Sequence, residues 1–209
     1  MPADLIHLVR HGEVHNPEGI LYGRIPGYHL SELGHEMAAV AAKSLEGRDI
    51  RRLIASPLQR TQESAKPWAD LFGLPIESDE RIIEPHNWFE GKRMREAIRR
   101  PSAWPRLANP LRPSWGEPYT SVLTRMFSAI DDAWRDTVGG EVVLVSHQMP
   151  IVTVARNVAG LRPFHDPRKR RCTLSSITTL QRDGDRFIEV DYQEPARELL
   201  ARSIDLGAV

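Results

Sequence analysis

Residues 141–147, EVVLVSH, form an unbroken apolar run that ends in polar residues. A run of this kind is typical of a strand that is buried on both faces, as in a parallel sheet covered by helices. Other segments with strand character lie at 5–10 (LIHLVR), 51–56 (RRLIAS) and 75–83 (PIESDERII). Because longer helical patterns separate these runs, the sequence predicts an α/β fold with a mostly parallel central sheet.

The segments between the strands predict four helices. Ser31 precedes the alanine-rich stretch that ends near Gly47. In SPLQRTQESAKPWADLF we expect Ser56 as N-cap, Pro57 at the first helical position and Gln59 to complete a capping box. The segment from 121 to 138 carries apolar residues on one helical face, and MPIVTVARNVAG forms a last helix.

A hairpin and an insertion modify the predicted parallel α/β fold. The segments SSITTLQRDG and RFIEVDY meet at an Asp-Gly turn, so we expect a hairpin that adds one antiparallel strand to the sheet. Residues 85–118 have no regular pattern and are rich in proline and tryptophan, which favours a small inserted cap. The expected architecture is a single domain over residues 1–209, in which helices cover a mostly parallel sheet with one antiparallel strand and the cap is inserted at about 85–118.

The 28 basic and 28 acidic residues cancel, so no net field attracts nucleic acid or an anionic membrane. No segment approaches the ~20 apolar residues that a membrane helix needs. The N-terminus MPADLIHLVRHG lacks a charged-then-apolar signal region, which favours a cytoplasmic location. The single cysteine, Cys172, excludes an intramolecular disulfide, and we expect it to fill a small core position.

Chemically reactive side chains follow the predicted strands. In an open parallel sheet, ligands bind outside the carboxyl ends of the strands. Successive strands are followed there by Arg10 and His11, by Arg60 in the first turn of a helix, by Glu84, and by His147. If the strands are neighbours, these five side chains share one rim.

Arginine forks and histidines at one rim predict a phosphate pocket that needs no metal, formed by Arg10, Arg60 and His147. Arg60 is unfavourably placed at a helix N-terminus, so its charge would add to a field that attracts an anion. His11 is the candidate nucleophile, because nearby arginines keep an imidazole neutral. Gly12 would let the phosphoryl group approach closely.

His147 and Glu84 are expected to stabilise charge and to transfer protons during the reaction. His147 would donate hydrogen bonds to the equatorial oxygens during phosphoryl transfer. Glu84, beside an apolar cap, would protonate the leaving alkoxide and then activate water.

Two other kinds of site deserve comparison. His11 and His15 have a zinc-ligand spacing, but Gly12 and the following Asn16-Pro17 make this segment a loop, so we expect no metal. The basic run at 162–171, RPFHDPRKRR, lacks a stacking platform for nucleic acid and is better interpreted as a solvated loop that weakly steers anions.

The segments LVRHGE, SPLQRTQESA and VVLVSHQMPI resemble the three signatures of the histidine phosphatase superfamily, the phosphoglycerate-mutase-like proteins. YGRIPGYHLSELG, RIIEPHNWFEG and GEPYTSVLTRM resemble further family segments in the right order. The resemblance implies a three-layer α/β/α sandwich around a mostly parallel sheet with one antiparallel strand. It also implies that His11 becomes phosphohistidine, that Arg10, Arg60 and His147 hold the phosphate, and that Glu84 donates the proton. Asn16 and Arg24 are implied substrate contacts.

This sequence differs from the residues that are usual in the family at Val14 and in the segment EPHNWFEG. Because of the second difference, His86 and Glu90 remain alternatives to Glu84 as the proton donor. The resemblance favours a phosphomonoesterase for a small phosphorylated metabolite, without a cofactor. A phosphoglycerate mutase and a non-catalytic phospholigand-binding module are the alternatives. A sheet edge near residues 186–193 predicts a homodimer contact.

Overall fold

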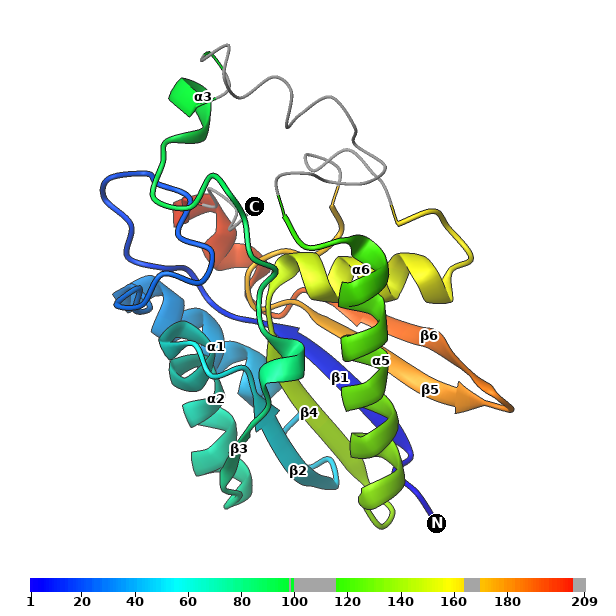
Figure 1. Ribbon diagram of the computed structural model, residues 1–209. Helices are drawn as coiled ribbons and strands as arrows, with labels where there is room; N and C mark the ends of the chain where they lie inside the picture. The colour runs from blue at the N-terminus through cyan, green and yellow to red at the C-terminus, as the bar shows by residue number, and fades with distance from the viewer. Residues whose placement is uncertain (98, 100–115, 164–169, 205–209) are drawn as a thin grey trace.

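The computed structural model describes residues 1–97, 99, 116–163 and 170–204. The expected cap at 85–118 and the basic run at 162–171 therefore lie partly outside the described residues. The described part is built around one six-stranded sheet with the order β3-β2-β4-β1-β5-β6 (Figure 1). Its strands are β1 (Leu5–Arg10), β2 (Ile50–Ala55), β3 (Ile76–Ser78), β4 (Glu141–Ser146), β5 (Ile177–Asp183) and β6 (Arg186–Gln193).

The sheet is mixed in the predicted way. The strands β1, β2, β3 and β4 are parallel, and β5 runs antiparallel to both of its neighbours, β1 and β6. The single antiparallel strand and the hairpin that creates it are thus confirmed. The strand β6 lies at the edge of the sheet, while its use in a homodimer stays a prediction.

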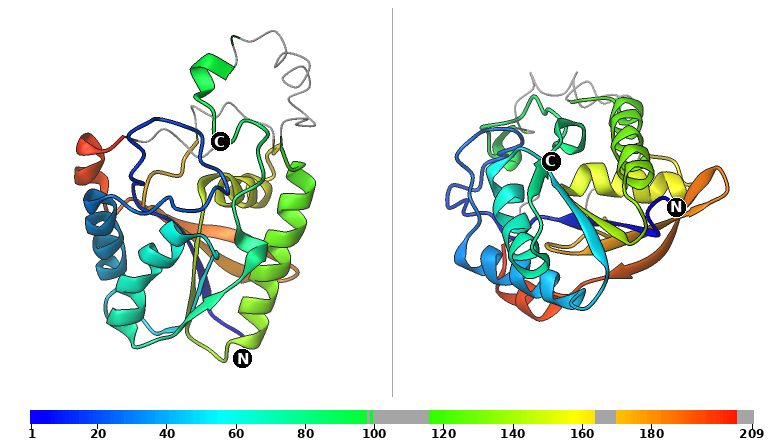
Figure 2. Two further views of the ribbon diagram at one scale, coloured as in Figure 1. Left: turned by 60° about the vertical axis from the view of Figure 1, so that its left-hand side comes forward. Right: turned by 90° about the horizontal axis from the view of Figure 1, so that it is seen from below.

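Helices cover both faces of the sheet, which confirms the three layers (Figure 2). Along β4, Val142 and Leu144 pack in one core, whereas Val143 and Val145 pack in the other. This alternation follows from the two-residue period of a strand. The first core includes α5 (Tyr119–Asp136) and α6 (Gln148–Val158), and the second includes α1 (Glu32–Ser44) and α2 (Gln59–Phe72).

The helix α1 begins as predicted, since the Ser31 side chain accepts a hydrogen bond from the backbone N–H of Gly34 at 3.0 Å. The predicted start of α2 is wrong. This helix begins at Gln59 after Leu58, without a side-chain cap, and the Ser56 hydroxyl is instead hydrogen-bonded to His147.

The third strand is shorter than predicted. It ends at Ser78, and a 3₁₀ turn, η1 (Glu80–Ile82), follows it. Asp79 caps this turn by accepting the backbone N–H of Arg81 at 2.8 Å. Glu84 therefore follows the 3₁₀ turn and does not end a strand, although it still reaches the same rim.

Gly12 makes a close backbone contact that was not predicted. A Cβ at this position would lie 2.3 Å from the backbone oxygen of Gly34, and a Cβ at Gly34 would lie 2.1 Å from the oxygen of Glu13. The two glycines let the loop after β1 pack directly against the start of α1. Gly12 therefore lets the loop that carries His11 pack on the helix, while its predicted role in the approach of a phosphoryl group stays a prediction.

Three smaller elements complete the described chain. The helix α3 (Met94–Ala97) belongs to the cap and stands above the rim, and η4 (Arg197–Arg202) lies near the C-terminus (Figure 1). Cys172 is buried in the core, as predicted. Within the described residues, every helix is too short or too polar to traverse a lipid bilayer.

Candidate active site

The five predicted side chains converge at the carboxyl end of the parallel strands. Arg10, His11, Glu84 and His147 are each 0% exposed, and Arg60 is 1% exposed. Burial of this many ionisable groups is unfavourable unless they bind one another or a ligand. Their convergence brings together the predicted nucleophile, cations and acid, whereas their chemical roles stay predictions.

His11 is held in one orientation. Its Nδ1 atom lies 2.7 Å from the carbonyl oxygen of Gly12, which can only accept a hydrogen bond. Nδ1 therefore carries the hydrogen of the neutral ring, and Nε2 carries the lone pair. The backbone is also fixed, because His11 donates to the Ser146 carbonyl at 3.2 Å and accepts from the N–H of Ser175 at 3.3 Å.

The two arginines are oriented by backbone carbonyls. Arg10 donates to the carbonyl of Cys172 at 2.7 Å, and Arg60 donates to that of Gly23 at 2.8 Å. The Arg60 guanidinium also lies over the Tyr22 ring, 4.8 Å from its centre. Burial lowers the pKa of Arg60 from its ordinary value. These carbonyl groups fix the positions of the two guanidinium groups at the rim.

His147 joins Arg60 to Ser56. The Arg60 guanidinium donates to Nδ1 at 3.1 Å, so Nε2 carries the hydrogen and donates to the Ser56 hydroxyl at 2.8 Å. Burial, followed by the charge of Arg60, lowers the pKa of His147 well below 6.5, in agreement with a neutral ring. Donation from His147 to a phosphoryl oxygen would use a proton on Nδ1, and this role stays a prediction. The His11 and His147 ring centres are 5.3 Å apart.

Glu84 is a buried acid that is half protonated near neutral pH. Burial raises the pKa of its carboxyl from 4.5 to about 7, against the opposing charges of Arg60, Arg170, Arg10 and Arg125. Its Oε2 atom is 3.7 Å from Nδ1 of His147. Among the described residues, neither carboxyl oxygen has a hydrogen-bond partner. Such a group can give a proton to a bound ligand and take one back.

The two alternative acids are less suitably placed. His86 is exposed, and Glu90 is half-buried with one carboxyl oxygen accepting the backbone N–H of Asn87 at 2.9 Å. Glu90 therefore stabilises the turn after Glu84. Burial and the raised pKa favour Glu84 as the proton donor of the three.

Asn16 and Arg24, the implied substrate contacts, both form hydrogen bonds within the protein. Asn16 closes its own loop through hydrogen bonds with the backbone of Ile20, at 2.8 Å and 3.3 Å. Arg24 donates to the backbone oxygen of Glu84 at 2.5 Å and to the Glu117 carboxylate at 3.3 Å. Contact between either residue and a substrate stays a prediction, and Arg24 lies nearer to the candidate acid.

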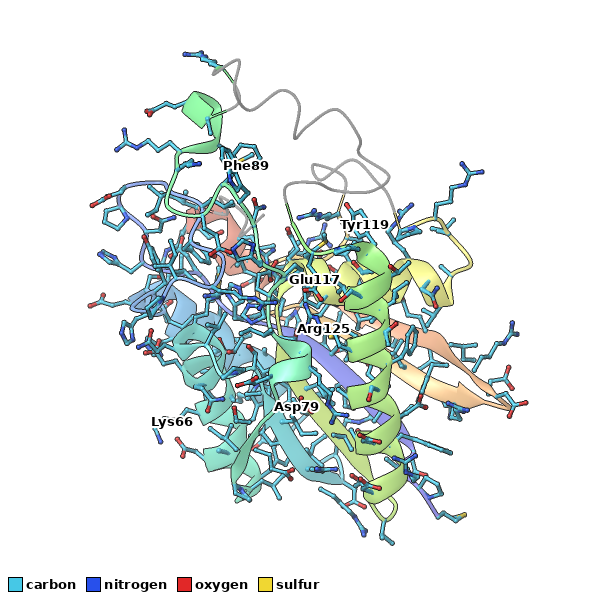
Figure 3. All side chains as sticks on the ribbon, viewed as in Figure 1. Lys66, Asp79, Phe89, Glu117, Tyr119 and Arg125 are labelled. Carbon is cyan, nitrogen blue, oxygen red and sulfur yellow. The ribbon has the colours of Figure 1, made fainter. Side chains whose placement is uncertain are left out.

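Sequence reasoning missed three residues that surround these groups. Glu117 pairs with Arg125 at 2.9 Å as well as with Arg24, and Figure 3 shows Glu117 and Arg125 together near the rim. Ser175, whose N–H contacts His11, has a φ of 56°, a left-handed conformation that is strained for serine. Arg170 is partly buried and acts on Glu84, so this end of the basic run is not the solvated loop predicted. No local sequence pattern marks these tertiary contacts.

The chain matches the family model "Histidine phosphatase superfamily (branch 1)" over residues 6–195, and it belongs to this superfamily. It is 52% identical over 200 residues to uncharacterized protein Rv0525 of Mycobacterium tuberculosis, covering 94% of this chain and 99% of that one. The Yersinia pestis protein named "Probable phosphoglycerate mutase GpmB" is 30% identical over 198 residues, which are 90% of this chain and 85% of GpmB.

A solved structure shows the same fold. The phosphoserine phosphatase of Entamoeba histolytica, in complex with phosphoserine, has a TM-score of 0.75 to this chain at 21% identity. The alignment covers 91% of this chain and 97% of the phosphatase. The superfamily contains phosphatases and mutases, so the chain's relatives define a class of phosphoryl-transfer proteins.

Proposed function

We propose that this protein is a metal-independent phosphomonoesterase that acts on a small cytoplasmic metabolite through a phosphohistidine intermediate. The observation that carries the proposal is a histidine fixed with its lone pair on Nε2, in a buried rim that also holds an acid with a pKa of about 7. A nucleophile and a proton donor of this kind are the two groups that ester cleavage needs when no cofactor takes part.

In the first step, Nε2 of His11 attacks phosphorus and the bond between phosphorus and the ester oxygen breaks. Glu84 gives its proton to the departing oxygen, so an alcohol leaves and Glu84 becomes a carboxylate. Arg10 and Arg60 balance the negative charge of the transferred group. Their positions are set by the Cys172 and Gly23 carbonyls before substrate binds, so little reorganisation is needed.

In the second step, the Glu84 carboxylate takes a proton from water as the water oxygen attacks phosphorus. The bond between phosphorus and Nε2 breaks, inorganic phosphate leaves, and both His11 and Glu84 return to their starting states. A carboxyl with a pKa of about 7 is suited to both directions of proton transfer, because either form is accessible near neutral pH.

The Yersinia pestis protein named "Probable phosphoglycerate mutase GpmB" supports a second candidate function, since its sequence matches most of this chain. A mutase returns the phosphoryl group to the substrate and must keep water out in between. The phosphatase is preferred, because the cap insertion of this chain is short. A non-catalytic binding module is disfavoured, because such a module needs no buried acid next to the nucleophile.

The proposal is tested by measuring phosphate release from a panel of phosphorylated metabolites in the presence of EDTA. We expect activity for the wild type and for His15→Ala, an exposed histidine in the same loop. His11→Ala should be inactive, and an acid-labile phosphoryl group should be trapped on the wild-type protein but not on this variant. Activity that requires a metal, or that survives His11→Ala, would contradict the mechanism.

The same panel separates the alternatives. Interconversion of 2-phosphoglycerate and 3-phosphoglycerate without net phosphate release would identify a mutase. Tight binding of a phosphorylated compound without turnover would identify a binding module.

A further inference from the structure

The peptide group between His11 and Gly12 is held on both of its sides. Its carbonyl, which belongs to His11, accepts the backbone N–H of Ser175 at 3.3 Å. Its N–H, which belongs to Gly12, donates to the side-chain oxygen of Ser64 at 3.1 Å. Because a peptide group is planar and rigid, hydrogen bonds on its two sides leave it little freedom to rotate. The proposed reaction steps give neither serine a role.

This peptide group controls the ring of the proposed nucleophile. The carbonyl of Gly12 accepts the hydrogen of His11 Nδ1 at 2.7 Å, and this contact leaves the lone pair on Nε2. The position of the Gly12 carbonyl depends on the peptide group that precedes it, since glycine itself permits many backbone conformations. If that peptide group rotates, the carbonyl moves and the ring loses the contact that sets its tautomer.

The Ser64 hydroxyl is oriented to accept a hydrogen bond. Ser64 is a buried residue of α2, and its hydroxyl donates to the Arg60 carbonyl, one helical turn earlier, at 2.8 Å. The single hydroxyl hydrogen is used in this bond, so the oxygen meets the Gly12 N–H with a lone pair. Ser64 therefore joins the helical turn that carries Arg60 to the loop that carries His11.

Ser175 reaches His11 through an unusual backbone conformation. Its φ of 56° lies in the left-handed region that serine rarely adopts. The next residue is held on both sides, because the Ser176 carbonyl accepts the Arg10 N–H at 3.1 Å and the Ser176 N–H donates to the Thr173 carbonyl at 3.1 Å. These bonds keep the segment against the end of β1, where the Ser175 N–H meets the His11 carbonyl.

Two unfavourable features coincide at Ser175. The first is the left-handed backbone, and a conformation of this kind persists only where the surrounding structure enforces it, often at functional sites. The second is the buried hydroxyl, which has no hydrogen-bond partner among the described residues. The contact with His11 is therefore made by the backbone of Ser175 and not by its side chain.

We propose that Ser64 and Ser175 are positioning residues that clamp the peptide group between His11 and Gly12, and thereby keep the lone pair of His11 on Nε2. The inference rests on the proposed role of His11 as nucleophile. Ser64 acts through its hydroxyl and Ser175 through its backbone, while bond cleavage remains with His11 and Glu84.

Variants at position 175 separate the backbone from the hydroxyl. Ser175→Gly removes the hydroxyl but adopts a positive φ without strain. Ser175→Thr keeps the hydroxyl, but its β-branched side chain disfavours the left-handed conformation. With p-nitrophenyl phosphate, kcat/KM should stay within about twofold of the wild type in Ser175→Gly. In Ser175→Thr it should fall about tenfold or more, because the nucleophile is misplaced.

Variants at position 64 test the hydroxyl itself. Ser64→Ala leaves the Gly12 N–H without its acceptor and should lower kcat/KM about tenfold or more. Ser64→Thr keeps a hydroxyl and should restore most of the activity. Ser44→Ala is the matched control, because the Ser44 hydroxyl also donates to a carbonyl of its own helix, that of Ala41 in α1, at 2.7 Å. It should behave as the wild type.

Binding and folding are measured on the same variants. The dissociation constant of inorganic phosphate, from calorimetry, should change less than about twofold, because the clamp orients the nucleophile and does not hold the anion. Thermal unfolding should show that the variants fold. If Ser175→Thr does not fold, Ser64→Ala and its rescue by Ser64→Thr decide the test.

The tautomer of His11 can be observed without turnover. In a long-range proton–nitrogen NMR spectrum at about pH 8, where an ordinary histidine is neutral, the ring nitrogens show which of them carries the hydrogen. The signals of His11 are identified by their absence in His11→Ala. We expect the hydrogen on Nδ1 in the wild type, in Ser175→Gly and in Ser44→Ala. In Ser64→Ala and Ser175→Thr, the tautomer with the hydrogen on Nε2 should appear.

The outcomes separate the clamp from the phosphatase function. A loss in Ser175→Gly as large as in Ser175→Thr would assign the effect to the hydroxyl and overturn the clamp. Wild-type activity in folded Ser64→Ala or Ser175→Thr, or an unchanged tautomer in both, would overturn it too. If the wild type releases no phosphate from any substrate, the phosphatase function fails, and the tautomer alone then decides for or against the clamp.

Discussion

The buried acid Glu84 yields a quantitative prediction for stability. Its pKa is about 7 in the folded protein and 4.5 as an ordinary carboxyl. Between these values the folded state holds a proton that the unfolded state has lost, so the free energy of unfolding decreases as pH rises from 4.5 to about 7. The difference corresponds to about 3 kcal/mol. Glu84→Gln, which cannot ionise, should lack this contribution.

The same group predicts the pH dependence of catalysis. The first step needs protonated Glu84, so kcat/KM for an alkyl phosphate should fall as pH rises through about 7. Glu84→Gln should lower this rate by about 10²- to 10⁴-fold and remove the decline. With p-nitrophenyl phosphate the leaving group departs without a proton, so the loss in the variant should be much smaller.

Two measurements check the reasoning. The first is kcat/KM for glycerol 3-phosphate and p-nitrophenyl phosphate between about pH 5 and about pH 9, for both proteins. The second is urea unfolding at about pH 5 and about pH 8, where the wild type should lose more stability than the variant. An alkaline decline that persists in Glu84→Gln, or equal losses for the two substrates, would refute the role of Glu84 as proton donor.

Three other predictions concern the surroundings of the site and the opposite end of the sheet. Gly12→Ala should destabilise the protein by about 1–3 kcal/mol in urea unfolding, because the new Cβ would lie 2.3 Å from the Gly34 oxygen, and an unchanged free energy of unfolding would contradict this. Glu117→Gln leaves Arg24 and Arg125 without their carboxylate, which lowers the pKa of Glu84, so the alkaline decline should move to lower pH; an unmoved decline would exclude the coupling. Burial opposes ionisation of Glu141, but its hydrogen bonds to His7 and Arg48 prevail and lower its pKa to about 2, so this group stabilises the fold above pH 4.5 and the contribution is lost as pH falls toward 2. Acid titration of stability should be flatter in Glu141→Gln than in the wild type, and an identical titration would show that the network does not matter.

Local sequence patterns predicted the framework well. The apolar runs that became β1 and β4 and the Ser31 cap of α1 depend on interactions between near neighbours, which periodicity and residue type express directly. The order of the strands, with β4 between β1 and β2, depends on packing between distant segments. The sequence could predict that the reactive side chains share a rim, because the carboxyl ends of parallel strands lie together.

The errors occurred where tertiary contacts outweigh local preference. Ser56 has the local pattern of a helix cap, but its hydroxyl is hydrogen-bonded to His147, which follows β4 and is 91 residues away in sequence. Arg170 lies in a run with the composition of a solvated loop, yet Gln148 and the site draw it into a partly buried position. The contact of Gly12 with the backbone of Gly34, which requires a small residue at position 12, was likewise not predicted. Each of these contacts joins segments that are far apart in the sequence, so local sequence patterns cannot predict it.

An isolated antiparallel β-bridge pairs Asn87 with Gly116 at the two ends of the cap insertion. It brings together the two ends of the cap insertion just after Glu84 and just before Glu117, so the chain leaves and rejoins the domain at one place. An insertion anchored in this way can be lengthened or exchanged at a small entropic cost, because closure of a loop depends only weakly on its length. A change in this one segment can therefore leave the proposed catalytic residues His11 and Glu84 in place.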